Sequence, residues 1–341
     1  MRHVWQFAGT WTFDPFPAAA IITAAAAYIG AAINVRRRHP ALPWPAWRTA
    51  CFLTALALTW IVLLGPVGAY DDVFFWAHMA QHITLMMLVA PLIMLGGPVL
   101  LLLRAASPAF RRRRLVPVLR SRAVRVLTNP VLTWVLFAAV LLGTHFSPFY
   151  DYALRHPDVH EFVEHPLYLG VALLYYYPLI GGNPCPRRVP PAARMVSLAL
   201  MMAPETMTGF FIYASNYLLY PFYAHVRRPF GPPPLADQQI GGILMWSGGM
   251  LIDAAWLVLA TTAWLRSEAT RTRRVDEQIA RELAARSEVR GAATGSGSCP
   301  LRRRRARRGA QPGRPGLSRG RASQRGPSLV RPSSSSLAMS R

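Results

Sequence analysis

The chain has 341 residues, of which 52% are apolar and 16% are charged, whereas an ordinary soluble domain has roughly 25% charged residues. Half of its 38 basic residues lie in the Ser-, Gly- and Pro-rich stretch 266–341, so the net charge of +23 is typical of a basic tail on a membrane protein, and we expect no nucleic-acid partner. The three cysteines are far apart, which excludes a disulfide framework and a CxxC-type thiolate site.

Seven stretches are apolar and long enough to cross a bilayer, which requires about 20 residues per helix. In chain order the predicted spans are 17–35, 48–68, 73–95, 130–148, 160–181, 195–218 and 239–264. The third should kink near Pro91 and end at the Gly96–Gly97–Pro98 break. We therefore predict an all-α, polytopic membrane helical bundle of about seven transmembrane helices at 1–265, followed by a basic, mostly disordered tail at 266–341.

Arginine placement predicts the orientation of the bundle. The segments that follow the first, third and fifth spans are rich in arginine, as is the tail, whereas the opposite segments hold most of the acids, including Asp71 and Asp72. Because positively charged loops stay in the cytoplasm, the N-terminus should lie outside and the C-terminus in the cytoplasm. The expected location is the bacterial plasma (inner) membrane, with the lipid bilayer as a partner of every span.

The histidines share one membrane face in this topology. Eight of the nine lie toward the outer side, including His145 at the end of the fourth span, and His39 is the exception. His78 and His82 are four residues apart, so they share a helix face with Met86 one turn further on. Such a pair can also hydrogen-bond a neighbouring helix, and methionines are often core packing.

A second cluster begins the fifth span, where His160 and Glu164 repeat the four-residue spacing and His165 follows directly. Neutral imidazole suits copper, zinc, iron and nickel, and a thioether favours Cu(I). Two helices that each offer a histidine pair at one membrane depth could therefore close a metal site, for which copper is the predicted ion.

Polar residues also occur in the last two spans. Glu205 and Asp253 lie near mid-membrane, where a charge costs at least about 2.5–3.5 kcal/mol, so each should be protonated, paired or facing a cavity. Either a proton or metal path or a buried interhelical hydrogen bond would explain them. Asp237 fits the N-cap of the seventh span, and Gln238 and Gln239 could orient imidazoles.

Four ordered motifs resemble the polytopic CtaG family of cytochrome c oxidase assembly factors. They are HMAQH at 78–82 with the Pro91 and Gly96–Pro98 signals after it, HEFVEH at 160–165, NPCP at 183–186 and ADQQIGGILMW at 236–246. The resemblance covers about residues 15–265, and Cys185 departs from it. It implies a seven-span bundle that helps to mature a haem–copper oxidase, with the ligands His78, His82, His160, Glu164 and His165 and a nearby polar set of Asp237, Gln238, Gln239 and Met245.

We expect a non-enzymatic assembly factor that binds copper at the periplasmic face and passes it to a haem–copper oxidase subunit. No GxSxG, Walker, Rossmann or HExxH motif supports an enzyme. The first alternative is a copper or proton transporter or channel that uses Glu205 and the methionines. The second is a haem-binding membrane redox subunit, since membrane haems also use histidine ligands.

Overall fold

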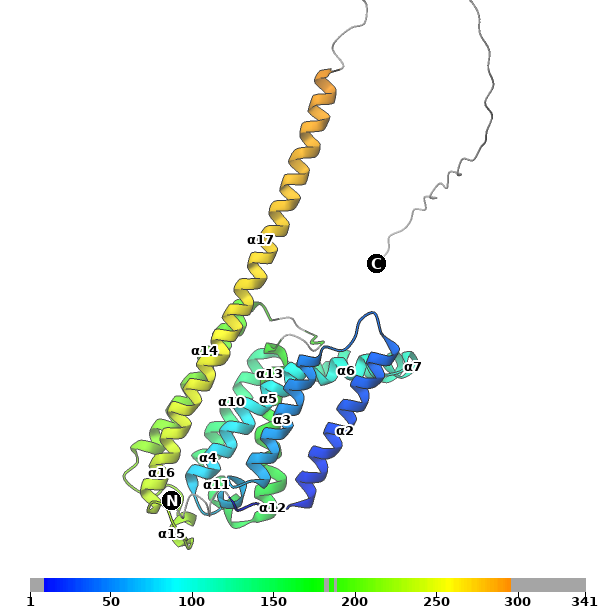
Figure 1. Ribbon diagram of the computed structural model, residues 1–341. Coiled ribbons are helices and arrows are strands. Elements are labelled where there is room, and N and C mark those ends of the chain that lie inside the picture. Colours follow the sequence, from blue (N-terminus) through cyan, green and yellow to red (C-terminus); the bar gives the residue numbers. More distant parts are fainter. Residues whose placement is uncertain (1–8, 181–183, 187–188, 296–341) are drawn as a thin grey trace, which may run out of the picture. The chain divides into compact units, whose positions relative to one another are not determined.

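The computed structural model describes residues 9–180, 184–186 and 189–295, and it is all-helical, with no strand within these ranges. The chain divides into two units, Met1–Arg274 and Val275–Arg341. The first unit is a helical bundle (Figure 1), which confirms the predicted fold class. His3, one of the histidines predicted on the outer side, residue 183 of the NPCP motif and residues 296–341 of the predicted tail lie outside the described residues.

The amino-terminal half of the bundle is built from two helices and one interrupted span. The two helices are α2 (Pro15–Arg38) and α3 (Ala46–Leu64), and the short turn η1 (Gly68–Tyr70) follows them. The interrupted span consists of α4 (Phe75–Ile83), η2 (Thr84–Val89), α5 (Ala90–Gly96) and α6 (Pro98–Ala105). Gly97, at φ 65°, makes the break before α6, as its sequence predicts.

Short helices then lead to the second half of the bundle. They are α7 (Pro108–Phe110), η3 (Arg111–Leu115), α8 (Val116–Arg120) and α9 (Arg122–Leu127). The segments that follow are α10 (Pro130–His145), α11 (Phe149–Arg155), α12 (Pro157–Val159), η4 (His160–Glu164), α13 (His165–Leu179), α14 (Pro191–Ala214), α15 (Phe222–His225), α16 (Pro234–Ile243), η5 (Leu244–Gly248) and α17 (Gly249–Gly295). α17 thus continues as helix through 266–295, which the sequence analysis assigns to the tail.

Five helical stretches among the described residues are long and apolar enough to cross a membrane, or six when one bent pair counts as a span. The five are Pro15–Arg38, Ala46–Tyr70, Phe75–Ala105, Pro191–Ala214 and Pro234–Arg286, and the pair is Pro130–His145 with Phe149–Arg155, bent by 65°. The remaining predicted span, 160–181, corresponds to η4 and the 15-residue α13. Seven spans and their orientation therefore stay predictions.

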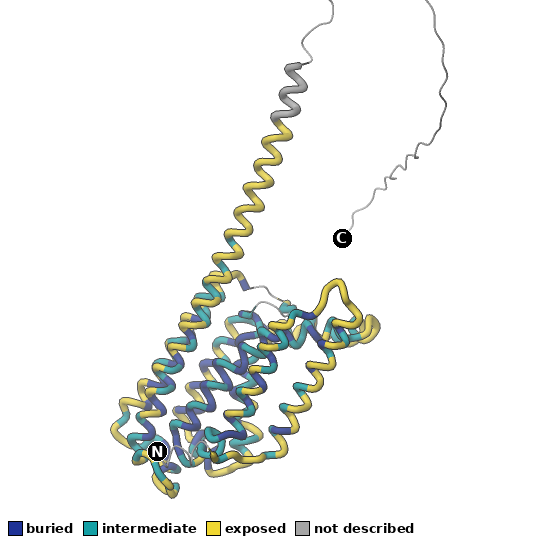
Figure 2. The backbone as a smooth tube through the Cα atoms, viewed as in Figure 1, coloured by how far each residue is buried: buried dark blue, intermediate teal, exposed yellow. Residues whose placement is uncertain are grey.

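Burial within the first unit suits a bundle that faces lipid. Figure 2 shows buried backbone on the central helices and mostly exposed residues along α2. The exposed side chains of α2 include Ile22, Ile29 and Ile33. Exposing an apolar surface of this extent to water is unfavourable. The outer surface of α2 is therefore suited to contact with acyl chains.

Three of the five η segments are π-helical turns that end two residues before a proline. η2 precedes Pro91, η3 precedes Pro117 and η4 precedes Pro166. Proline lacks an N–H and its ring collides with the carbonyl of the preceding turn, so a widened turn accommodates it without ending the helix. The predicted irregularity at Pro91 is thus a π-turn, placed directly after His82.

Candidate metal site

Four segments of the first unit bring the outer histidines together. α4 carries His78 and His82, the end of α10 carries His145, and η4 with the first residue of α13 carries His160 and His165. His78, His82 and His145 are buried, and the other two are half-buried. The centres of neighbouring rings in this group lie 4.0 Å (His78–His82), 5.0 Å (His78–His160), 4.5 Å (His160–His165) and 6.2 Å (His82–His145) apart, so the imidazoles gather inside the bundle.

The centre of this cluster is the buried carboxylate of Glu164. Nε2 of His78 and Nε2 of His82 approach its Oε1 to 3.4 Å and 3.6 Å. Neither contact is a well-formed hydrogen bond, and both ring nitrogens of each histidine lack a hydrogen-bond partner among the described residues. Buried polar atoms are rarely left in this way.

These separations fit ligands of one ion. Nitrogen and oxygen ligands at about 2.0–2.2 Å from a tetrahedral metal lie roughly 3.4 Å from each other. The 3.4 Å and 3.6 Å spacings around Glu164 are therefore compatible with ligands of one ion. His78, His160 and Glu164 also form a group whose ligand atoms all lie within 4.8 Å of one another. The residues present fit a metal.

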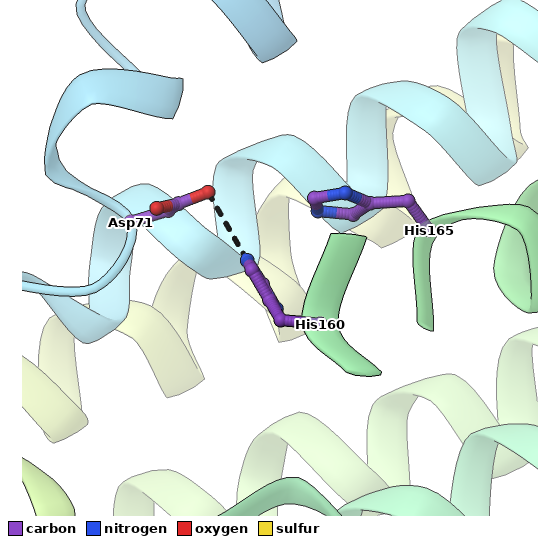
Figure 3. Close-up of side chains that lie close together, drawn as sticks. All are labelled: Asp71, His160 and His165. Atoms are coloured by element: carbon purple, nitrogen blue, oxygen red, sulfur yellow. Dashed lines mark hydrogen bonds and ion pairs between the residues drawn. The ribbon is translucent and has the colours of Figure 1, made fainter. Parts of the chain in front are cut away.

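His160 links two carboxylates. Its Nδ1 donates to Oε2 of Glu164 at 2.7 Å, and its Nε2 donates to Oδ2 of Asp71 at 3.3 Å (Figure 3). Because carboxylates only accept, both ring nitrogens carry protons and His160 is an imidazolium in this arrangement. Burial acts to raise the pKa of Asp71, but the hydrogen bond and charge of His160 outweigh it and hold that pKa below its ordinary value.

His165 lies beside this pair, and its tautomer follows from its partner. Gln81 Nε2 donates to the carbonyl of Val62 at 3.0 Å, so the amide oxygen of Gln81 faces His165. That oxygen accepts from Nε2 of His165 at 2.8 Å, which leaves Nδ1 as the lone-pair nitrogen. Asp71, His160 and His165 form a second group with ligand atoms within 4.8 Å.

His145 was noted in the sequence only for its membrane side, yet it belongs to the interior of the cluster. Its Nδ1 donates to the carbonyl of Leu141 at 2.8 Å, so Nε2 is the lone-pair nitrogen of the neutral ring, and this buried nitrogen has no hydrogen-bond partner among the described residues. A cavity of about 20 Å³ lies against it. Its lining is Met79, His82, Ile83, Met86, Met87, Phe137, Leu141, His145, Glu205 and Met245.

Buried tyrosines cover the cluster, and no sequence pattern pointed to them. The ring of Tyr150 meets His78 at a centroid distance of 4.7 Å, and Tyr168 meets His82 at 4.2 Å. The hydroxyl of Tyr150 lies 3.0 Å from that of Tyr223, which donates to the backbone carbonyl of Asp71 at 2.9 Å. Burial raises the pKa of Tyr223, which lies outside the spans, well above its ordinary value. These phenols therefore stay neutral and limit the access of water.

Asp237 does not cap its own helix, contrary to the prediction. It is the fourth residue of α16, and its carboxylate accepts from the backbone N–H groups of Phe75 at 2.9 Å and Trp76 at 3.1 Å. Arg228 completes the arrangement with a 2.9 Å ion pair. The prediction was wrong because three residues of helix precede Asp237 and Pro233 holds the N-cap position, whereas the free N–H groups at the start of α4 lie next to Asp237. Asp237 thus anchors the helix that carries His78.

Gln238 and Gln239, which were expected to orient imidazoles, make no recorded contact with a histidine among the described residues. Gln238 accepts from the N–H of Leu219 at 2.8 Å and donates to the carbonyl of Tyr217 at 3.1 Å, so it fixes the loop between α14 and α16. Gln239 is half-buried on α16. Of the polar set at 237–245, only Met245 reaches the cavity beside the histidines.

The two carboxyl groups that the sequence places near mid-membrane are neighbours in the bundle. Glu205 and Asp253 lie close enough to interact electrostatically, and both residues are buried. Oε2 of Glu205 and Oδ2 of Asp253 have no hydrogen-bond partner among the described residues. Glu205 also borders the cavity that His82 and His145 line, so it faces a cavity, which is one of the arrangements expected for an intramembrane acid.

Comparison with known proteins identifies the family. Uncharacterised proteins of Mycobacterium bovis and Mycobacterium tuberculosis are each 33% identical over 265 residues, which is 76% of this chain and 40% of their own length. One from Mycobacterium leprae is 30% identical over 273 residues, or 78% of this chain and 41% of its own. The chain thus spans about two fifths of the length of these relatives, and no solved structure matches it. Because the family model for the cytochrome c oxidase caa3 assembly factor (Caa3_CtaG) matches residues 26–267, this membrane-type helical chain belongs to the Caa3_CtaG family.

Proposed function

We propose that this protein is a non-enzymatic assembly factor that binds copper in the cluster around Glu164 and aids its delivery to a haem–copper oxidase subunit. The observation that carries the proposal is the convergence of His78 and His82 on one carboxylate oxygen, at 3.4 Å and 3.6 Å. Copper is the cargo and needs no chemical conversion here. Membership of an oxidase assembly family supports the choice of client.

The distribution of arginine supports a periplasmic place for this cluster. The end of α2 and the Arg-rich region of α6 and α7 lie at one end of the first unit, whereas α11, α12 and α15 lie at the other (Figure 1). The positive-inside rule assigns the arginine end to the cytoplasm. The histidine cluster, which adjoins α12, then faces the periplasm of a bacterial plasma membrane.

The donor set is suited to handing an ion on. Imidazole and carboxylate ligands hold copper less tightly than a closed thiolate cage, and each can be exchanged for a ligand of the recipient. His160 adds a second feature. It donates a hydrogen bond from each ring nitrogen, so it must lose one of these protons before it can bind a metal ion. Binding is therefore coupled to proton release.

Metal analysis of the purified full chain tests the proposal. The His78→Ala/His82→Ala variant removes two of the ligands, so we expect it to lose its copper and to leave oxidase activity low in a strain that carries only this copy. His225→Ala, at an exposed position on α15, is the matched control and should keep both. Unchanged copper content together with full oxidase maturation in the double variant would remove the mechanism.

One observation favours the transporter alternative enough to test it. The cavity beside His82 extends to Glu205, which neighbours Asp253 near the predicted middle of the membrane. Uptake of radiolabelled copper into vesicles that contain the protein separates the two functions. An assembly factor should show no uptake above protein-free vesicles, whereas uptake that is lost in Glu205→Gln would favour transport.

A further inference from the structure

We propose that the methionine-lined cavity below the Glu164 cluster is a second metal position, which takes a soft monovalent ion, Cu(I), through His145 and the thioethers of Met86 and Met245. This deepens the proposed function, since it places a second stop for the same cargo. Its ligands are separate from the carboxylate set, and His82 borders both positions.

The lining of the cavity has the chemistry of a soft site. Four of its residues are methionines, Met79, Met86, Met87 and Met245, and they come from α4, η2 and η5. All four are at least 94% buried, so water does not compete at their sulfur atoms. Thioethers select Cu(I) over the harder divalent ions. A volume of about 20 Å³ suits a single ion or water.

A nitrogen ligand is already prepared for this position. Nδ1 of His145 is held by the carbonyl of Leu141, which places the lone pair on the buried, unpartnered Nε2. A metal-binding imidazole commonly has its other nitrogen fixed in this way. The orphaned nitrogen is the observation that distinguishes this cavity from ordinary methionine packing.

His82 borders both metal positions. Its Nε2 lies 3.6 Å from Glu164, and its ring also lines the cavity. The ring centres of His82 and His145 are 6.2 Å apart. Two imidazoles that ligate one ion have ring centres roughly 5–6.4 Å apart, so the distance between these two rings is compatible with a shared ion. His82 is therefore the residue through which an ion could pass between positions, staying Cu(I) throughout so that no electron is exchanged.

The η2 π-turn places Met86 in the cavity lining. This turn precedes Pro91 and directly follows the helix of His82. π-Turns are concentrated at functional sites. On the other side, Met245 belongs to the η5 π-turn, so two irregular turns supply the thioethers.

X-ray absorption of Cu(I) bound anaerobically to the full-length protein in detergent tests the proposal. We expect sulfur as well as nitrogen neighbours in the wild type. Met86→Leu/Met245→Leu keeps the side-chain volume and should lose the sulfur neighbours and weaken Cu(I) binding by about tenfold or more. Met201→Leu, a buried methionine outside the cavity lining, is the matched control and should behave as the wild type.

Zn(II) binding and Glu164→Gln separate this proposal from the one on which it rests. Zn(II) should occupy the carboxylate cluster, so Glu164→Gln should weaken Zn(II) binding and leave the sulfur neighbours of Cu(I) in place. If Glu164→Gln bound Zn(II) as tightly as the wild type while Cu(I) kept its sulfur neighbours, the outer site would be contradicted and the inner site would stand. Cu(I) without sulfur neighbours, or a double methionine variant that matches Met201→Leu, would overturn the inner site. Equal unfolding midpoints of the two methionine variants would show that both are folded.

Discussion

The spacing of individual ligands determined how much of the site the sequence could predict. His78 and His82, and His160 and Glu164, are four residues apart, so helical geometry alone places each pair on one face. The three imidazoles meet the carboxylate of the fourth residue, Glu164. Local periodicity was therefore sufficient to pair these residues along each helix, whereas the meeting of the two pairs depends on how the helices pack.

Among residues outside the proposed ligand set, Asp237 is the one whose substitution we expect to lower the stability of the fold most. Asp237→Ala removes two charge-assisted hydrogen bonds to α4 and leaves Arg228, which is 11% exposed at its side chain, without its ion pair. Breaking a buried pair costs about 3–5 kcal/mol, so the unfolding midpoint in detergent should fall clearly. Copper affinity should fall as well, because α4 carries His78.

Asp158→Ala is the control for this prediction, since Asp158 is an exposed acid of the same outer region. It should leave both the midpoint and the affinity unchanged. If Asp237→Ala proved no more harmful than Asp158→Ala, the anchoring role would be wrong.

The partners of Asp237 and Gln81, and the position of His145 against the cavity, could not be predicted from the sequence. Each depends on contacts between residues far apart in the chain, such as Gln81 with His165 and Asp237 with Phe75. Sequence spacing carries no information about such pairs. It also misled, because an acid near a helix start fits an N-cap until the true start of α16 at Pro234 is known.

Among the elements, α14 and α16 approach each other closely through two glycines. A Cβ on Gly209 would lie 2.6 Å from the backbone nitrogen of Trp246, and one on Gly242 would lie 2.6 Å from that of Tyr213. Backbone cannot move aside as a side chain can. These two positions therefore require glycine for the helices to stay in contact.

Gly209→Ala should destabilise the protein by about 1–3 kcal/mol, since it forces the two helices apart. Gly143→Ala on α10 is the control, because a Cβ there meets nothing within 4 Å. Alanine is the better helix former, so that variant should be equal to the wild type or more stable by up to about 1 kcal/mol. Thermal unfolding in detergent compares them, and an equally tolerated Gly209→Ala would contradict the close approach.

The arrangement of elements was predictable to the extent that it follows from hydropathy. The break at Gly97 and most span positions agree with the sequence, whereas the π-turns before Pro91 and Pro166 were not predicted. Hydropathy measures length and polarity, and it is blind to how a helix relieves a local steric conflict.

At the scale of the whole molecule, acidification should release the metal. Protons compete for imidazole nitrogens, whose ordinary pKa is about 6.5, so copper affinity should fall by roughly tenfold or more between pH 7.5 and 5.5. Binding in weakly buffered detergent solution should correspondingly release protons, His160 being one source. An affinity that is constant over this range would contradict histidine ligation.

Acidification from pH 7.5 to 5.5 should not remove the contribution of Asp71 to the stability of the fold. A carboxyl with a lowered folded-state pKa contributes stability above its ordinary pKa of about 3.9, and the contribution is lost only as the pH falls through the lower folded value. Asp71 therefore stays ionised from pH 7.5 to 5.5. Unfolding midpoints of the metal-free protein, measured at both pH values, check that metal loss is not unfolding.

The contact between Asp237 and the first turn of α4 has a practical consequence for labelling. The segment between α15 and α16 contains exposed positions such as Pro229 and would attract an epitope tag or a fluorescent probe. However, Arg228 in that segment forms an ion pair with Asp237, and Asp237 accepts a hydrogen bond from the first turn of α4, the helix that carries His78 and His82. A reporter inserted there would disturb α4 and so change the metal binding that it was meant to report. The Arg-rich segment η3, at the opposite end of the bundle, is the safer attachment point.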